Sequence, residues 1–264
     1  MATKTTLNKS GYDKNLTFYN CNLNNKTIPS IFIHGVGLDI SMWDKQKKFF
    51  KKNFLYYDLI NHGKTKKVLK KLTYENYNSQ LKALINYFNL KKINLIGYSI
   101  GSIIALNFSI KNKKLVNKLV LISSVYKRSA YEKKLVKSRY YSAIKEKSVS
   151  KKTVNRWFTK KYLMKNFKTY NKFYSVLENN KKNNFLPAYN LFANSNNLKY
   201  NFKHFNIPTL LITGEKDYNS TPKMSLQLNK EIKNSKLKIV SKAKHMAIYE
   251  KAHIVNREIK NFLK

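Results

Sequence analysis

The sequence predicts an α/β fold in which a mostly parallel central sheet has flanking helices and a helical lid is inserted between two sheet strands. Short apolar runs alternate with longer amphipathic segments, and this alternation fills two separate regions of the chain. The region between them contains no strand-like run. We therefore expect a core formed by residues 1–124 and 207–264 and a lid formed by residues 125–206.

The first region predicts buried strands and an amphipathic helix. The strands are expected at Ser30–His34, Ile93–Gly97 and Leu119–Ser123. Between them, the segment Glu75–Phe88 places apolar side chains on one face of a helix, namely Tyr77, Leu81, Leu84, Ile85 and Phe88. Another apolar run, Phe54–Asp58, is short for a sheet strand.

Residues 125–206 differ in composition from the rest of the chain. They include no Asp, and they carry 20 basic and three acidic residues, a net charge of +17. Three of the four arginines of the chain fall here. Helical spacing relates Val154, Trp157, Phe158 and Tyr162, so we expect a basic helical lid over the sheet.

The second region returns to the alternating pattern after Pro208. It predicts strands at Thr209–Thr213 and Leu237–Val240. A final helix is indicated by an apolar stripe formed by Ile254, Val255, Ile259, Phe262 and Leu263.

The 264-residue chain carries 53 Lys or Arg and only 13 Asp or Glu, so its formal charge is +40. Four of the basic residues are Arg, and Lys is spread along the whole chain. Because nucleic-acid recognition favours the planar Arg fork, we expect nucleic acid to bind only non-specifically and weakly. The seven Gly and four Pro exclude collagen-like and low-complexity classes, and 14% aromatic residues supply a core.

Targeting signals are missing from the sequence pattern. Residues 1–15 contain no apolar run, and Cys21 has no partner for a disulfide. The segment Ile93–Ile110 approaches the length of a membrane span, but polar residues and glycines interrupt it. We expect a cytoplasmic protein without a membrane span.

One cysteine and scattered histidines provide no metal-ligand spacing, so no metal or other cofactor is expected.

The sharpest motif is Gly97-Tyr98-Ser99-Ile100-Gly101, which follows a predicted strand and precedes the apolar segment Ser102–Ile110. This is the G-x-S-x-G nucleophile elbow in its required strand–turn–helix context. The flanking glycines let the backbone fold back, and the turn raises the serine hydroxyl above the sheet. We predict that Ser99 is a catalytic nucleophile.

A serine nucleophile needs a base, and the base needs an orienting carboxylate. Asp217, one of only five Asp in the chain, follows the strand Thr209–Thr213 and is the predicted acid. Glu215, two residues earlier, is the alternative acid. The position after Leu119–Ser123 offers no carboxylate.

His245 is the predicted base, because it follows the last strand and precedes the final helix, at the sheet edge where ligands bind. His253 falls within or next to that helix, and His204 falls in the lid. His34 follows the first strand, where we interpret it as a structural hydrogen-bonding residue.

Acyl transfer also needs two backbone donors for the oxyanion. The amide of Ile100 lies directly after the nucleophile at a helix N-terminus. The second donor is expected from His34-Gly35-Val36-Gly37, whose glycines allow close approach, and we assign it to Val36.

With these motifs placed, the chain resembles the lidded α/β-hydrolase family over nearly its whole length. The Asp-x-x-Gly-His-Gly-x-Ser segment of that family is imperfect here, because Asp58–Thr65 has Asn61 in place of Gly and Thr65 in place of Ser. Within the family, Ser99 resembles the nucleophile of esterases and lactonases.

A finer resemblance points to 3-oxoadipate enol-lactonase-like members. It rests on Met42–Gln46, Arg156–Thr159 and Thr221-Pro222. The resemblance implies that Arg156 and Trp157 lie in the lid and face the substrate. For Trp157, packing of the lid onto the core is an equally good interpretation of its spacing.

These residues and patterns are consistent with three functions. The first is a serine hydrolase that cleaves a small, anionic carboxylic ester or lactone. The second is an esterase for a methyl ester linked to an acidic carrier protein, which would dock on the basic lid. The third is a non-catalytic anion-binding module on the same fold, which would have no need for Ser99, Asp217 and His245 at three strand ends.

Overall fold

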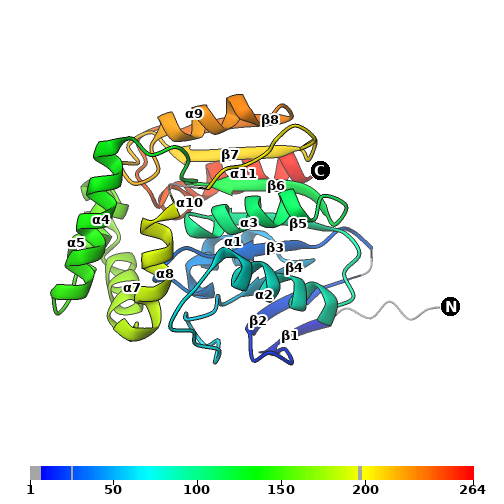
Figure 1. The fold of residues 1–264 in the computed structure, drawn as a ribbon, viewed down its shortest axis with the longest axis horizontal. Coiled ribbons are helices and arrows are strands. Elements are labelled where there is room, and N and C mark those ends of the chain that lie inside the picture. Colours follow the sequence, from blue (N-terminus) through cyan, green and yellow to red (C-terminus); the bar gives the residue numbers. More distant parts are fainter. Residues whose placement is uncertain (1–6, 25, 196–197) are drawn as a thin grey trace.

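An eight-stranded sheet forms the middle layer of the molecule (Figure 1). The structure, a computed structural model, describes residues 7–24, 26–195 and 198–264. Along the sheet the described strands follow the order β1-β2-β4-β3-β5-β6-β7-β8. Their bounds are β1 Leu7–Tyr12, β2 Phe18–Leu23, β3 Ser30–Ile33, β4 Phe54–Tyr57, β5 Ile93–Tyr98, β6 Val116–Ile122, β7 Thr209–Gly214 and β8 Ser235–Val240.

The strands from β4 to β8 along this order are parallel, whereas β1 pairs with β2 and β2 with β4 in antiparallel fashion. The expectation of a mostly parallel α/β sheet is confirmed. The antiparallel pair β1–β2 was not expected.

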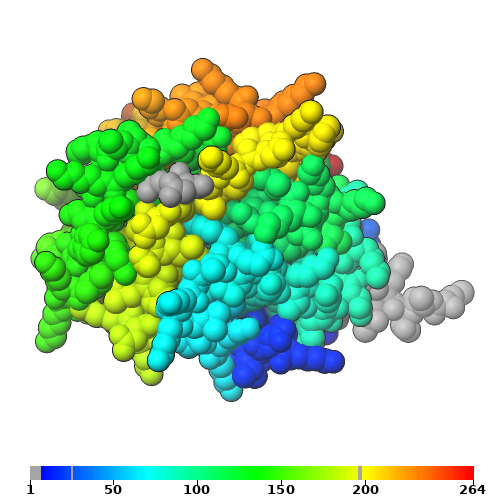
Figure 2. Space-filling view, in the orientation of Figure 1, coloured from blue at the N-terminus to red at the C-terminus, as the bar shows by residue number. Residues whose placement is uncertain are grey.

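Helices cover both faces of the sheet and one of its ends (Figure 1). The core helices are η1 Ile40–Trp43, α1 Asp44–Phe49, α2 Tyr74–Tyr87, α3 Ile100–Lys111, α9 Pro222–Glu231, α10 Ala247–Glu250 and α11 Ala252–Leu263. Between β6 and β7 lie α4 Ala130–Lys145, α5 Ser150–Trp157, α6 Lys160–Lys165, α7 Phe167–Glu178 and α8 Lys182–Ala193. We call residues 125–206 the insertion. Figure 2 shows the insertion, in green to yellow, packed against the core.

Alternation along the strands divides the core into two clusters. Ile31 and Ile33 of β3 pack with α2, α3 and α9, whereas Phe32 packs on the opposite face with α11. Successive side chains of a strand point to opposite faces, so a sheet covered on both sides needs continuous apolar runs. This explains the consecutive apolar residues within β3, β4, β6 and β7, whereas Asn94 interrupts the apolar residues of β5.

The parallel strands bring their carboxyl ends to one edge of the sheet, and the predicted site residues follow these ends. Ser99 comes directly after β5, Asp217 follows β7 and His245 follows β8. Ligands bind outside the carboxyl ends of strands in open α/β sheets. The insertion leaves the core at the carboxyl end of β6.

Several predicted boundaries shift by one to three residues. The predicted strand at Ser30–His34 ends at Ile33, and the predicted helix at Glu75–Phe88 spans Tyr74–Tyr87, where Thr73 forms a capping box with Asn76. The short run at Phe54 is a full member of the sheet, since β4 pairs with both β2 and β3.

The apolar stretch at Ile93–Ile110 forms β5 and most of α3 rather than one long helix. Within the described ranges, no helix has the length and apolar character needed to cross a bilayer. The expectation for residues 1–15 falls partly on residues 1–6, which lie outside the described residues.

Candidate active site

Ser99 occupies the sharp turn between β5 and α3. Its backbone has φ 55° and ψ −118°, a conformation that residues other than glycine rarely adopt. It is the N-cap residue of α3, yet its side chain makes no capping hydrogen bond. Instead, Ser99 lines a cavity that residues of the insertion also line. The elbow therefore presents the hydroxyl to the cavity rather than to the helix.

Gly97 and Gly101 are required by space. A Cβ atom on Gly97 would clash with the carbonyl of Gly101, and one on Gly101 would clash with the carbonyl of Ile33. Because both obstacles are backbone atoms, they cannot rotate away. The two glycines of the motif thus permit the close crossing of β5, α3 and β3 on which the turn depends.

Asp217 and His245 meet at the same edge of the sheet. The His245 Nδ1–H group donates to Asp217 Oδ2 at 2.7 Å, and both residues are buried. The other oxygen, Oδ1, accepts from the backbone amides of Asn219 and Ser220 at 2.8 and 3.0 Å. The acid is thus fixed by its own loop, and its second oxygen orients the imidazole.

The backbone of His245 is also held. Its carbonyl accepts hydrogen bonds from Ser123 Oγ at 3.1 Å and from the Tyr98 hydroxyl at 3.4 Å. The ring of Trp157 lies 6.4 Å from the imidazole, centroid to centroid. Ser123 directly follows β6, the strand end that offers no carboxylate. Its hydroxyl therefore helps to position the predicted base, His245.

The structure separates the alternatives that the sequence left open. Glu215 is exposed and accepts from the backbone amide of Lys242 at 2.7 Å, so it does not reach His245. His204 and His253 are exposed and do not line the cavity.

Val36, the residue to which the second oxyanion donor is assigned, lies on the loop after β3. Val36 lines the cavity beside Ser99, and Ile100 is the first residue of α3, where amides have no acceptor within the helix. A Cβ atom on Gly35 would lie 2.9 Å from the Tyr98 ring and 3.4 Å from Ser99 Cβ. Glycine at this position brings the loop against the elbow.

Two buried histidines hold this loop in place. His34 Nε2 accepts from the amide of Leu59 at 2.9 Å, and His62 Nε2 accepts from the amide of Gly37 at 3.0 Å. Their Nδ1 atoms lie 2.8 and 3.0 Å from carbonyl oxygens, so the Nδ1–H tautomer satisfies both rings. Burial lowers the pKa of His62 to about 4 and that of His34 well below its usual value, so both rings are neutral. The interpretation of His34 as structural agrees with these contacts.

In the imperfect motif Asp58–Thr65, the two substituted residues, Asn61 and Thr65, fit the local backbone and hydrogen bonds. Asn61 adopts φ 68°, in the left-handed region that favours glycine, which asparagine tolerates. The Thr65 hydroxyl donates to the carbonyl of Asp58 at 2.6 Å and accepts from the amide of Phe18 at 3.0 Å. Asp58 accepts from the amides of Ile40 and Lys64, both at 2.8 Å.

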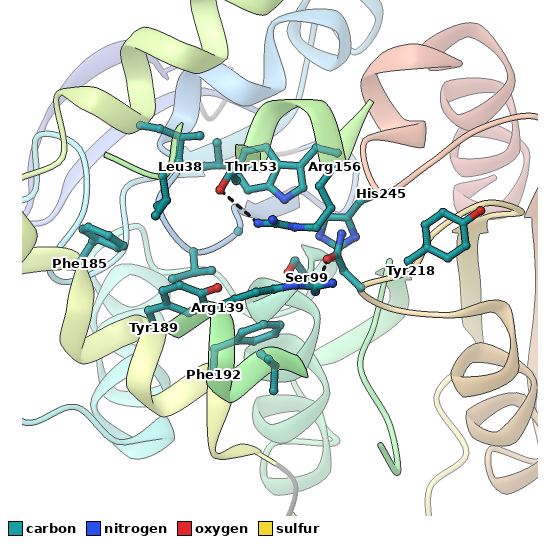
Figure 3. A pocket seen from close by; sticks show the side chains of 18 of the residues that line it. Leu38, Ser99, Arg139, Thr153, Arg156, Phe185, Tyr189, Phe192, Tyr218 and His245 are labelled. Atoms are coloured by element: carbon teal, nitrogen blue, oxygen red, sulfur yellow. Dashed lines mark hydrogen bonds between the residues drawn. The ribbon is translucent and has the colours of Figure 1, made fainter. Parts of the chain in front are cut away.

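The cavity lies between the sheet edge and the insertion and encloses about 930 Å³, its opening to solvent included. Figure 3 shows Ser99 and His245 beside the side chains contributed by the insertion. Arg156 and Trp157, for which the resemblance implies a position facing the substrate, both line this cavity. The sequence did not identify most of the other lining residues, among them Arg128, Arg139 and Tyr189. The unusual concentration of arginine in the insertion was the available signal.

The segments behind the finer resemblance have different roles in the structure. Trp43 is buried in the core, Gln46 donates to the carbonyl of Ile248 at 2.9 Å, and Thr221 is the N-cap of α9. Of these segments, Arg156–Thr159 contributes residues to the cavity wall.

Comparison with known sequences identifies a family and a relative that extends over most of the chain. The model of the alpha/beta hydrolase fold family matches residues 31–252. An Acinetobacter baylyi protein named (E)-2-((N-methylformamido)methylene)succinate hydrolase is 27% identical over 240 residues, covering 89% of this chain and 90% of that protein.

Solved structures show the same fold. The enol-lactonase from Burkholderia xenovorans LB400 superposes with a TM-score of 0.82 at 19% identity, covering 97% of this chain and 99% of that one. A thermophilic esterase from Thermogutta terrifontis, solved with malate bound, gives a TM-score of 0.82 at 18% identity, covering 99% and 98%. Since the family model spans the sheet from β3 to the start of α11, this chain belongs to the α/β-hydrolase fold family.

Proposed function

We propose that this α/β-hydrolase is a serine hydrolase that cleaves a carboxylic ester or lactone of a small, anionic substrate, in the manner of the enol-lactonase-like members. The observation that carries the proposal is the buried 2.7 Å Asp217–His245 pair, which opens into the same cavity as the strained Ser99 elbow. Ser99 and His245 line one cavity, and Asp217 is buried behind His245, so the three side chains match the roles of nucleophile, base and orienting acid.

In the proposed reaction, Ser99 Oγ attacks the carbonyl carbon while His245 Nε2 accepts the hydroxyl proton. Asp217 stabilises the imidazolium that forms, and the amides of Val36 and Ile100 donate to the oxyanion. Collapse of the tetrahedral intermediate breaks the ester bond, and His245 returns the proton to the leaving alkoxide. Water then attacks the acyl-enzyme by the same sequence and releases the acid and free Ser99.

An anionic substrate is supported by Arg156. Its guanidinium lines the cavity, and Nη2 donates to Thr153 Oγ1 at 3.1 Å while Nε is buried without a partner in the described chain. A carboxylate would supply an acceptor, and its attraction to Arg is strongest where water is excluded. The name of the Acinetobacter relative describes a substituted succinate, an anionic compound, which favours the same class.

The direct test is covalent labelling by a fluorophosphonate probe, which reacts with activated serines. We expect the purified protein to be labelled at Ser99 and the Ser99→Ala variant to remain unlabelled. An unlabelled wild type that is folded by circular dichroism would refute the serine-hydrolase proposal.

A second candidate function is hydrolysis of a methyl ester linked to an acidic carrier protein. The positive charge on the surface of α4 favours it. Lys134, Lys137 and Lys145 are exposed there and line a shallow groove. Gel filtration with an acidic acyl carrier protein at low and high salt tests this candidate, since docking through exposed lysines must weaken with salt.

A further inference from the structure

The cavity differs from the rest of the molecule in the kind of basic residue that it uses. Lysine dominates the basic residues of the chain, and only four are arginine. Three of those four, Arg128, Arg139 and Arg156, line the cavity, and no lysine is found among its described lining residues. A compositional bias toward lysine would place lysines here as elsewhere. The basic groups of this cavity are therefore guanidinium forks, each of which can bind a carboxylate through two parallel hydrogen bonds.

Two charged residues of the cavity wall, Arg128 and Glu132, make hydrogen bonds to other residues of the protein. Arg128 donates to the carbonyl of Phe192 and to Ser195 Oγ, both at 3.1 Å, and stacks 4.7 Å from the Phe192 ring. The Glu132 carboxylate accepts from the amide of Ser129 at 2.7 Å and from Thr221 Oγ1 at 3.4 Å. These contacts assign structural roles to both residues.

Arg139 and Arg156 are in a different situation. Arg139 Nη1 donates to Asn219 Oδ1 at 2.6 Å, and Arg156 makes its contact with Thr153 on its own helix. For neither guanidinium does a carboxylate of the described residues lie within ion-pair distance. Each has five N–H donors, so a bidentate partner can still be accommodated.

The two guanidinium groups also repel each other. Burial lowers the pKa of both arginines, and the positive charge of Arg139 lowers the pKa of Arg156 further. Figure 3 shows both side chains extending into the cavity beside Ser99, with Tyr189 close to Arg139. They are anchored at separate points, Arg139 on the loop that carries Asp217 and Arg156 on α5. Two partly buried like charges with separate anchors are best neutralised by two anions.

We propose that Arg139 is a second carboxylate-binding residue that acts with Arg156, so that the substrate carries two carboxylates besides the scissile acyl group. This rests on the proposed function for the identity of the reaction, and it adds a residue and a substrate class. The two carboxylates fix the substrate at two points, which leaves the acyl carbon over Ser99.

The test measures binding directly and needs no turnover. Isothermal titration calorimetry at about 0.15 M salt, where exposed charges are screened, compares isosteric pairs of acids: succinate with butanoate, glutarate with pentanoate and adipate with hexanoate. In each pair a methyl group replaces one carboxylate. We expect the wild type to bind at least one dicarboxylate about tenfold or more tightly than its partner.

The variants Arg139→Gln and Arg156→Gln should each reduce this preference to about threefold or less. Arg139→Lys, which keeps the charge but loses the fork, should lie between wild type and Arg139→Gln, and it is informative if the glutamine variant fails to fold. Arg257→Gln is the matched control, because Arg257 is exposed on α11 outside the cavity, and it should bind as the wild type does.

Each other outcome overturns the proposal. Equal weakening of monoacids and diacids in Arg139→Gln would mean that the two arginines share one carboxylate. An unchanged preference in Arg139→Gln would leave that residue a structural link to Asn219, and tighter binding of inorganic phosphate than of any diacid would assign a different anion. Fluorophosphonate labelling of the same samples reports on Ser99 separately, so failure of the serine-hydrolase proposal is distinguishable from failure of this one.

Discussion

Replacing Asn61 with glycine would remove a tether between the core and the insertion while keeping the backbone conformation. The Asn61 side chain is buried, and its Nδ2 donates to the carbonyl of Asn184 on α8 at 2.7 Å and to that of Leu69 at 2.9 Å. Its Oδ1 accepts from the amide of Leu69 at 2.8 Å. Glycine adopts the observed φ of 68° freely, so Asn61→Gly isolates the side chain.

The magnitude follows from these three contacts. A buried hydrogen bond contributes about 0.5–1.5 kcal/mol net, and glycine adds about 0.5–1 kcal/mol of conformational entropy to the unfolded chain. Part of that entropy is offset because asparagine is mildly strained at positive φ. We expect Asn61→Gly to lower the free energy of unfolding by roughly 2–4 kcal/mol.

Urea unfolding followed by circular dichroism measures this change, with the slope m checked for constancy. Asn89→Gly is the matched control, because Asn89 also has positive φ, 51°, but is exposed and has no side-chain hydrogen bond within the described chain. It should shift stability by about 0.5 kcal/mol or less. If Asn61→Gly costs no more than Asn89→Gly, the tether contributes nothing and the reasoning is refuted.

Three further predictions concern the site. Ser99→Ala should lower kcat on p-nitrophenyl acetate by roughly four orders of magnitude or more with an unchanged melting curve, and a loss below tenfold would contradict its role. His245→Ala should do the same, whereas dialysis against EDTA should leave wild-type activity intact. For His62, whose folded pKa is about 4 against 6.5 unfolded, the unfolded chain takes up the proton first as pH falls, so its contribution to stability is lost between about pH 6.5 and 4. The stability difference between wild type and His62→Gln should therefore shrink by roughly 3 kcal/mol over that window, and a pH-independent difference would refute the assignment.

The elbow and its context could be predicted because their signals are local. Gly97, Ser99 and Gly101 stand within five residues, between an apolar strand and an apolar helix, and each is needed for backbone reasons. The strand ends that carry Asp217 and His245 were also recognisable, since parallel strands share one edge. Whether those side chains meet depends on long-range packing, and the 2.7 Å contact comes from the structure.

The antiparallel strands β1 and β2 were missed for a different reason. β1 is mostly exposed and polar, so it has no apolar periodicity. β2 does bury alternate residues, Tyr19, Cys21 and Leu23, and this period of two was a usable signal.

The cavity wall was the least predictable part. Helical spacing predicts an apolar face for α5, but it does not show how a helix is rotated about its axis relative to the sheet. Arg139 lies on a helix whose neighbours Lys137 and Ser138 are exposed, and nothing local distinguishes it from them except its identity. In a chain that uses lysine almost everywhere, arginine itself was the signal.

Glycine, like arginine, is rare in this chain, and several of its positions mark places where the backbone needs it. The chain has seven, and a Cβ atom on Gly97, Gly101 or Gly214 would clash with backbone carbonyls that cannot move aside. By contrast, three positions with positive φ, at 53, 61 and 89, are occupied by asparagine, which accepts this conformation at modest cost. At Gly97, Gly101 and Gly214 no side chain fits, so glycine is required there whatever the composition of the rest of the chain. Glycine at the elbow and arginine at the cavity are both exceptions to the composition of this chain, and both occur where the proposed chemistry needs that residue.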